Sequence, residues 1–182
     1  PMVDLGYLAA VTKNIALGTA GIVSPLRNPV LTAKQAASVD RLSGGRLLLG
    51  MSSGDRPVEY PAFGYEFNNR ADRFREAWDV IRLLTENSFP KGTTEYYGNF
   101  NGGIDLVPKL AAPRLPMITI GRARQDKSWI ANHSDAWIWH GVDPKPSGDI
   151  VKAIAELGDG SDRKGLGLGR SVDLGGSGYH QD

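Results

Sequence analysis

Three apolar segments of the chain are each followed at once by small or polar residues that can bind a ligand. The first segment ends in Gly-Thr-Ala-Gly, the second in Ser-Ser-Gly-Asp and the third in Gly-Arg-Ala-Arg. Hydroxyl groups, free backbone amides and guanidinium groups are donors that hold phosphate in proteins. The candidate binding residues are therefore Thr19, Ala20, Gly21, Ser52, Ser53, Gly54, Gly121, Arg122, Ala123 and Arg124.

Each pattern also has a purely structural interpretation. Gly21 can simply complete a tight turn after a strand. Arg56, which follows the second group, can bind a phosphate or can form a surface ion pair with Asp55 or Glu59. Residues 121–125 can form a solvated basic loop. A glycine loop that opens a helix is nevertheless a ready anion site, because amides and the helix dipole converge there.

Two strands with a helix between them must position the first two groups. Residues 15–20 and 46–51 are short apolar runs that predict buried parallel strands. Between them, Asn28 is a suitable N-cap, Pro29 fits the first helical position, and Ser43-Gly44-Gly45 is a helix stop. Further along, a helix capped by Asn68 or Asn69, a strand over 116–120, helical residues 128–132 and a strand over 135–140 are expected. This alternation favours a parallel sheet with right-handed crossovers.

Two segments fall outside the alternation. Residues 86–114 are rich in Gly, Asn, Pro and Tyr, and we expect an excursion with short strands around 94–97 and 104–107. Residues 158–182 are glycine-rich with little apolar periodicity, which indicates an irregular tail. We expect residues 1–182 to form a single, partial domain.

The composition argues against several classes of function. A net charge of +1 gives no electrostatic reason to expect a nucleic acid or an anionic membrane as partner. No apolar run approaches the length of a membrane span, and no signal-peptide pattern is present. Without cysteine, and with three histidines in no His-x-x-x-His pair, we expect no metal site. No hydrolase triad is visible. We expect a cytoplasmic protein.

The order and wording of the segments resemble the luciferase-like flavin monooxygenases. The distinctive segments are LGTAGIVSPLRNPV, DRLSGGRLLLG and YPAFG. Members of this family carry a similar threonine-led strand, a Pro-x-Arg/His-x-Pro loop, a Ser-x-Gly-Arg turn and a later Phe-Gly. The resemblance covers residues 8–84 well and 113–140 more loosely, and the variant present here looks closest to an uncharacterised bacterial branch.

The resemblance implies an α/β fold, the (β/α)8 TIM barrel, with FMN at its C-terminal face. A full barrel needs roughly 250 residues, so we expect this one to be incomplete at both ends. In the family, the tip at Thr19–Gly21 faces the flavin, often with a non-proline cis peptide, for which Ala20–Gly21 is the candidate. Residues 121–124 correspond to its phosphate loop. A small organic substrate, a separate flavin reductase and a homodimer are also implied.

Aromatic residues have further possible roles. One of Trp137 and Trp139, which alternate on a strand, can close a flavin pocket, or both can be core residues. The aromatic loop from Phe63 to Phe67 can contact substrate or a dimer partner, or plug the barrel. No catalytic residue is assigned, because in this family such residues often come from the first strands, which we expect to be absent from this chain.

The chain departs from the family pattern at two places. The luciferases have Cys-Arg where this chain has Ser52-Ser53, so the phosphate arginine is missing there and Arg56 is a possible substitute. The phosphate loop carries Arg122 and Arg124 where serines or threonines are usual. The first hypothesis is an FMN- and oxygen-dependent monooxygenase. The alternatives are a deazaflavin-dependent hydride-transfer enzyme and a non-catalytic flavin-binding relative.

Overall fold

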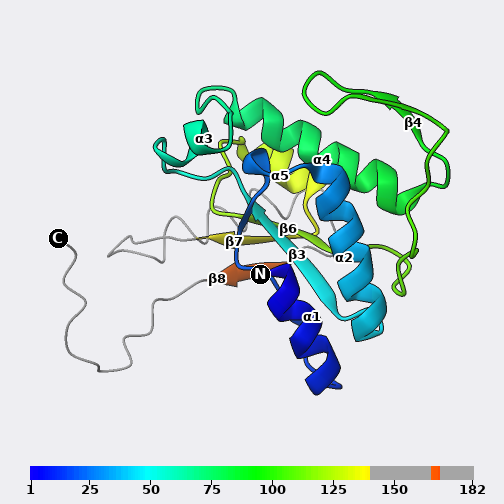
Figure 1. Cartoon of the computed structure of the whole chain (residues 1–182). Helices are drawn as coiled ribbons and strands as arrows, with labels where there is room; N and C mark the ends of the chain where they lie inside the picture. The colour runs from blue at the N-terminus through cyan, green and yellow to red at the C-terminus, as the bar shows by residue number, and fades with distance from the viewer. Residues whose placement is uncertain (140–164, 169–182) are drawn as a thin grey trace, which may run out of the picture.

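The computed structural model describes residues 1–139 and 165–168 of the chain (Figure 1). Helices alternate with strands as the sequence predicts, and no helix in these two ranges is long and apolar enough to cross a membrane. The elements are α1 (Met2–Val11), β1 (Leu17–Gly18), β2 (Ile22–Val23), the 3-10 helix η1 (Ser24–Leu26), α2 (Pro29–Ser43), β3 (Leu47–Ser52), α3 (Glu59–Ala62), α4 (Arg70–Glu86), β4 (Lys91–Thr93), β5 (Asn99–Asn101), β6 (Met117–Ile120), α5 (Lys127–His133), β7 (Ala136–Trp139) and β8 (Gly165–Leu168).

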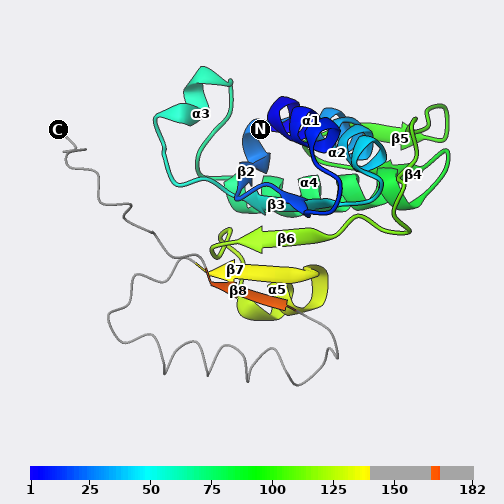
Figure 2. The same cartoon turned by 90° about the horizontal axis from the view of Figure 1, so that it is seen from below.

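The main sheet is parallel and runs in the order β1, β3, β6, β7, β8, with β2 also paired to β3. Figure 2 shows β3, β6, β7 and β8 as a row, with α1 and α2 lying together along one side of β3. Within the described residues the row does not close on itself. This arrangement is the one expected of part of a (β/α) barrel, in which helices cover one face of a parallel sheet.

The structure confirms the predicted start and end of α2. The side chain of Asn28 accepts hydrogen bonds from the amides of Val30 (2.9 Å) and Leu31 (3.3 Å), which satisfies two free helix donors. Gly44 ends the helix with φ +68°, the left-handed conformation that glycine adopts without strain. Fully buried alanines along the inner face, Ala33 and Ala37 among them, allow α2 to lie close to the core.

The strand predicted over 15–20 is shortened to β1 in the structure, and a second short strand, β2, follows it. β1 pairs Gly18 with Leu48, and β2 pairs Ile22 with Met51. Four steps of the chain therefore face three steps of β3, so one extra residue forms a bulge between β1 and β2. The expected single strand over 15–20 is wrong in this respect, and the bulge lies at the tip that the sequence marks as a binding site.

The excursion over 86–114 contains an antiparallel hairpin at a different place from the one expected. β4 and β5 pair over 91–93 and 99–101, not over 94–97 and 104–107. The carboxylate of Glu76 on α4 accepts hydrogen bonds from the amides of Glu95 and Tyr96 (2.7 Å to Tyr96), so this aromatic stretch is the hairpin turn. Aromatic composition favoured a strand there, but the contact with α4 decides the conformation.

The glycine-rich tail is not irregular throughout. Its residues Gly165–Leu168 form β8, which pairs in parallel with β7. The rest of the segment predicted over 158–182 lies outside the described residues.

The arginine of the Ser-Gly-Gly-Arg segment has a structural role. The guanidinium of Arg46 donates to the carbonyls of Ala9 (3.2 Å), Thr12 (2.9 Å) and Ile15 (2.7 Å). It lies just before β3 and so binds the carboxyl end of α1 and the loop that follows. A cation at this position complements the free carbonyls of a helix end.

Asp135 links β6 and β7 to α4 at the opposite end of the strands from the bulge. Its carboxylate accepts a hydrogen bond from the amide of Met117 (2.8 Å) and pairs with Arg82 and Arg114. Burial raises the pKa of this carboxyl, but the Met117 amide and the two guanidinium groups outweigh burial and hold the pKa below its ordinary value.

We expect Asp135→Asn to lower the free energy of unfolding by about 2 kcal/mol at pH 7, because it removes hydrogen bonds between charged groups that are partly shielded from water. A folded-state pKa below the unfolded value means that the carboxylate stabilises the protein above roughly pH 4, and that this contribution is lost as the pH falls through the folded pKa. Urea unfolding at pH 7 and pH 3 measures both effects.

The matched control is Glu86→Gln, which removes a more exposed carboxylate from the same network. Its cost should stay below about 1 kcal/mol. An Asp135→Asn variant with an unchanged unfolding midpoint at pH 7, or with the same deficit at pH 3, would contradict this account.

Candidate functional site

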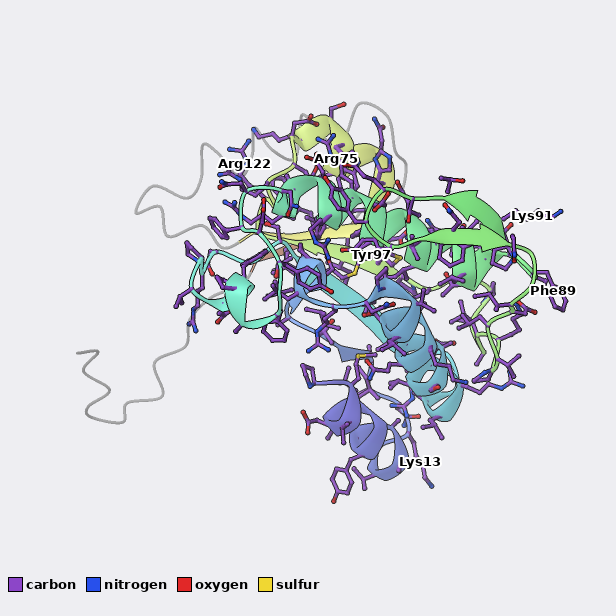
Figure 3. The ribbon with its side chains drawn as sticks, turned by 45° about the horizontal axis from the view of Figure 1, so that its top comes forward. Lys13, Arg75, Phe89, Lys91, Tyr97 and Arg122 are labelled. Atoms are coloured by element: carbon purple, nitrogen blue, oxygen red, sulfur yellow. The ribbon has the colours of Figure 1, made fainter. Side chains whose placement is uncertain are left out.

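The ends of three strands surround a cavity of about 300 Å³. It lies where the chain leaves β1, β3 and β6, the carboxyl edge of the parallel sheet, which is the functional face of barrels. Figure 3 shows Arg122 at this end of the molecule, opposite to Phe89 and Lys91. The lining residues are Ala20, Gly21, Ser52, Ser53, Gly54, Asp55, Ile120, Gly121, Arg122 and Ala123.

The structure brings together eight of the ten residues that the sequence singled out; Thr19 and Arg124 are the two that do not line the cavity. Sequence reasoning omitted Asp55 and Ile120 from this set. Both adjoin residues that it selected, and Ile120 is the last residue of an apolar strand, where a core role was the simpler expectation. Its side chain is 4% exposed and forms an apolar floor for the cavity.

The first wall of the cavity is formed by Ala20 and Gly21, and Thr19, which does not line the cavity, supports it. Its hydroxyl donates to the carbonyl of Gly50 (2.7 Å) and accepts from the amide of Gly50 (2.8 Å), so a side chain takes the place of a backbone partner at the bulge. A Cβ at Gly50 would lie 2.0 Å from the carbonyl oxygen of Thr19, so the strands can approach this closely only if residue 50 is glycine. Thr19 therefore positions the tip.

Gly21 gives this wall its shape. The peptide bond expected to be cis, Ala20–Gly21, is trans: among the described residues the cis bond is Val107–Pro108. The chain turns instead through Gly21, whose φ of +136° is open to glycine but strained for other residues. A Cβ here would lie 3.4 Å from Oγ of Ser52 and 3.6 Å from Ile120, within the space that the cavity occupies.

Tyr60 of α3 supports the second wall. Its ring is fully buried, and its hydroxyl donates to the carbonyl of Ser53. Burial raises the pKa of Tyr60, so the phenol stays a neutral donor at physiological pH. Gly54 follows with φ +71°, and a Cβ there would lie 2.7 Å from Val23. Arg56 forms the surface ion pair with Glu59 (3.4 Å), and its side chain is 74% exposed.

The third wall is the loop after β6, held from two sides. The indole of Trp137 donates to the carbonyl of Gly121 (2.6 Å), which gives this tryptophan a role at the cavity and in the core. The buried amide of Gln125 donates to the carbonyls of Ala71 on α4 (3.1 Å) and Ala123 (3.0 Å). Ala123 and Arg124 adopt positive φ values of 46° and 61°, a strained conformation that these contacts maintain.

The helix that follows this loop does not offer a free N-terminus. The carboxylate of Asp126 caps α5 and accepts a hydrogen bond from the amide of Trp129 (2.6 Å). The sequence predicts that the amides and the dipole of this helix bind an anion. In the structure the carboxylate of Asp126 already occupies that position. The loop and Arg122 remain as the candidate anion-binding groups on this side of the cavity.

The charge on this side is positive. Burial lowers the pKa of Arg70 at the start of α4, and the nearby guanidinium of Arg124 lowers it further. Arg122 lines the cavity, and within the described part of the chain it has no ion-pair partner. Across residues 1–139 and 165–168 no cluster of His, Asp and Glu could hold a metal ion. The cavity thus combines small residues, hydroxyls, the carboxylate of Asp55 and the guanidinium of Arg122; on the side of Arg122 it suits a ligand with a flat body and an anionic group.

Comparison with known proteins adds independent information. The family model for luciferase-like monooxygenases matches residues 1–172. An uncharacterized protein of Mycobacterium tuberculosis is 31% identical over 170 residues, which cover 91% of this chain and 58% of that protein. The chain spans about half the length of such curated relatives.

Solved structures agree on the fold. The monooxygenase RslO1 of Streptomyces bottropensis aligns with TM-score 0.77 at 20% identity, covering 87% of this chain and 48% of that one. The coenzyme F420-dependent tetrahydromethanopterin reductase of Methanopyrus kandleri aligns at 0.69 and 21% identity over 92% and 53%. The oxygenating constituent of 3,6-diketocamphane monooxygenase, from a plasmid of Pseudomonas putida and in complex with FMN, aligns at 0.69 and 18% over 91% and 51%.

We expect Thr19→Val to lower the free energy of unfolding by about 1–3 kcal/mol, because valine keeps the shape of threonine but leaves the buried amide and carbonyl of Gly50 without partners. Thr19→Ser is the matched control, since it retains the hydroxyl, and its cost should be smaller. Urea unfolding followed by tryptophan fluorescence measures both. Equal losses for the two variants would show that the hydroxyl does not hold the bulge.

Proposed function

The chain belongs to the luciferase-like monooxygenase family, and on that premise we propose that it is a flavin-dependent oxidoreductase that uses reduced FMN and oxygen on a small organic substrate. The observation that carries the proposal is the cavity at the carboxyl edge of the sheet, formed by the tips of β1, β3 and β6. Eight of its ten lining residues are among those that the sequence singles out as candidates for binding the cofactor.

The residues present fit such a cofactor. Ala20 has only a methyl group and Gly21 has no side chain, so a flat ring can approach the backbone there, near the apolar side chain of Ile120. Ser52 and Ser53 offer polar groups, and Arg122 offers a cation for a phosphate on the opposite wall. When bound, reduced FMN supplies the electrons that activate oxygen, and the protein contributes binding and orientation.

A deazaflavin that transfers hydride is the second candidate, and one observation favours it. The F420-dependent reductase of Methanopyrus kandleri shares this fold, and a 5,10-methylenetetrahydromethanopterin reductase of Archaeoglobus fulgidus is 37% identical over 99 residues, covering 54% of this chain and 29% of that protein. Both cofactors carry a flat tricyclic ring and a phosphate, so the lining described above suits either. We propose FMN first because the oxygenating constituent of 3,6-diketocamphane monooxygenase, which shares this fold over 91% of the chain, holds FMN.

The remaining parts of the proposal concern how the site is used. A separate flavin reductase would supply the reduced cofactor, and two copies of the chain would associate as a homodimer. The rival is a relative that binds flavin without turnover, since the Ser52-Ser53 pair lacks the arginine of the luciferases. Retained flavin without oxygen-dependent turnover in the presence of a reductase would favour that rival.

Titration with FMN, riboflavin and a deazaflavin, followed by fluorescence, tests the cofactor. We expect FMN to bind at least tenfold more tightly than riboflavin, because riboflavin lacks the phosphate that Arg122 would bind. A preference for the deazaflavin would transfer the assignment to hydride transfer. No binding of any of the three would remove the enzymatic assignment and leave the fold unchanged.

Arg122→Ala tests the phosphate position. We expect the Kd for FMN to rise about tenfold or more while the Kd for riboflavin stays unchanged, because a charge-assisted hydrogen bond contributes about 1.5–3 kcal/mol. Arg124→Ala is the matched control: it removes the same charge two residues away, at a side chain that does not line the cavity. If FMN affinity survives Arg122→Ala, or falls equally in both variants, the phosphate does not lie against this residue.

A further inference from the structure

A second and larger cavity, of about 620 Å³, lies on the other side of the tip that bears Gly21. It is bounded by β2, η1, the first turns of α2 and the loop that carries α3. Gly21 lines both cavities, so the two adjoin at a residue that has no side chain. A ligand in the second cavity would therefore lie next to whatever occupies the first.

Apolar side chains form much of the second cavity, beside the polar side chains of Thr32 and Gln35. Ile22 and Leu26 form its inner side and are buried. Leu31 of α2 and Phe63 after α3 form its rim, and they are 63% and 58% exposed. Apolar side chains that remain exposed around a concave surface are typical of a binding site, because a ligand that covers them releases water from apolar area.

Arg27 is the cation in this cavity that is left without a partner. The other charged groups in the lining are paired, Glu59 with Arg56 and the amino group of Pro1 with Asp4 (3.5 Å), and the side chain of Asn28 is engaged by the amides of α2. Within residues 1–139 and 165–168 the guanidinium of Arg27 makes neither a hydrogen bond nor an ion pair. A guanidinium beside apolar walls is suited to a carboxylate or another anionic oxygen group, which it can bind through two parallel hydrogen bonds.

The backbone that carries Arg27 is held firmly. Its amide donates to the carbonyl of Ser24 (3.0 Å), and the carbonyl of Pro25 accepts two hydrogen bonds, both 3.3 Å, from the buried guanidinium of Arg73. Arg73 is itself enclosed by the rings of Tyr65 (3.9 Å) and Tyr97 (4.9 Å). The side chain of Arg27 therefore extends from a backbone segment that neighbouring residues hold in place.

We propose that the second cavity is the substrate pocket of this site, and that it takes an apolar molecule with a single anionic oxygen group, which Arg27 binds. The proposal rests on the proposed function for its claim that the occupant is a substrate, because a flavin in the first cavity would meet that occupant across Gly21. The apolar walls hold the body of the molecule, and Arg27 fixes its orientation.

A pair of fluorescent probes that differ by one charge tests the pocket. Anilinonaphthalene sulfonate carries an apolar body and an anionic sulfonate, and N-phenyl-1-naphthylamine is the same body without the charge. We expect Arg27→Met to raise the Kd of the sulfonate about tenfold or more and that of the neutral probe less than twofold. Phe63→Ala should weaken both probes. Arg56→Met, which removes an exposed arginine paired to Glu59, should change neither.

Flavin measurements on the same variants separate this inference from the proposed function. We expect Arg27→Met to leave the Kd for FMN unchanged, and the sulfonate probe to shift the visible absorption of FMN bound to the unmodified protein without displacing it. Equal binding of the sulfonate to Arg27→Met and to the unmodified protein, or competition between probe and FMN, would overturn the pocket. An Arg27-dependent probe site in a protein that binds no flavin would instead overturn the proposed function and, with it, the substrate role.

Discussion

The close approach of Thr19 to Gly50 is the contact on which the site depends. A threonine hydroxyl satisfies both backbone groups of Gly50, and the carbonyl of Thr19 fills the volume that any side chain at position 50 would need. One extra residue therefore fits between β1 and β2 as a bulge, and the chain bends away from the sheet there instead of continuing as a regular strand. Gly21 stands at this tip between the two cavities.

The walls of the site are shaped by residues that do not line it. Tyr60, Trp137 and Gln125 each donate to a backbone carbonyl of a lining loop or its neighbour, and all three are buried. Tyr60 comes from α3, Trp137 from β7 and Gln125 from the loop before α5, where it also binds Ala71 of α4. Small lining residues have few contacts of their own, and this support from outside is what fixes their positions.

Much of this arrangement follows from local sequence, and the rest depends on contacts across the fold. The bounds of α2 follow from Asn28 and Gly44, and the apolar run before Ser52 identifies β3. The partner of Thr19 is 31 residues away, so no local pattern reveals the bulge. The hairpin was misplaced for the same reason, because Glu76 lies 19 residues or more from the amides that it binds. Residues at strand ends were found because chain order alone places them at one edge.

The hydrogen bonds of the Arg46 guanidinium couple the local stability of the end of α1 to that of the sheet. Three carbonyls between Ala9 and Ile15 depend on one guanidinium that enters from the start of β3. If the last turn of α1 unfolds locally, the guanidinium of Arg46 loses its hydrogen-bond acceptors. The end of the helix and the start of β3 therefore open as one cooperative unit. Slow amide hydrogen exchange would then extend from β3 into the end of a short helix that would otherwise be among the first parts of the chain to exchange.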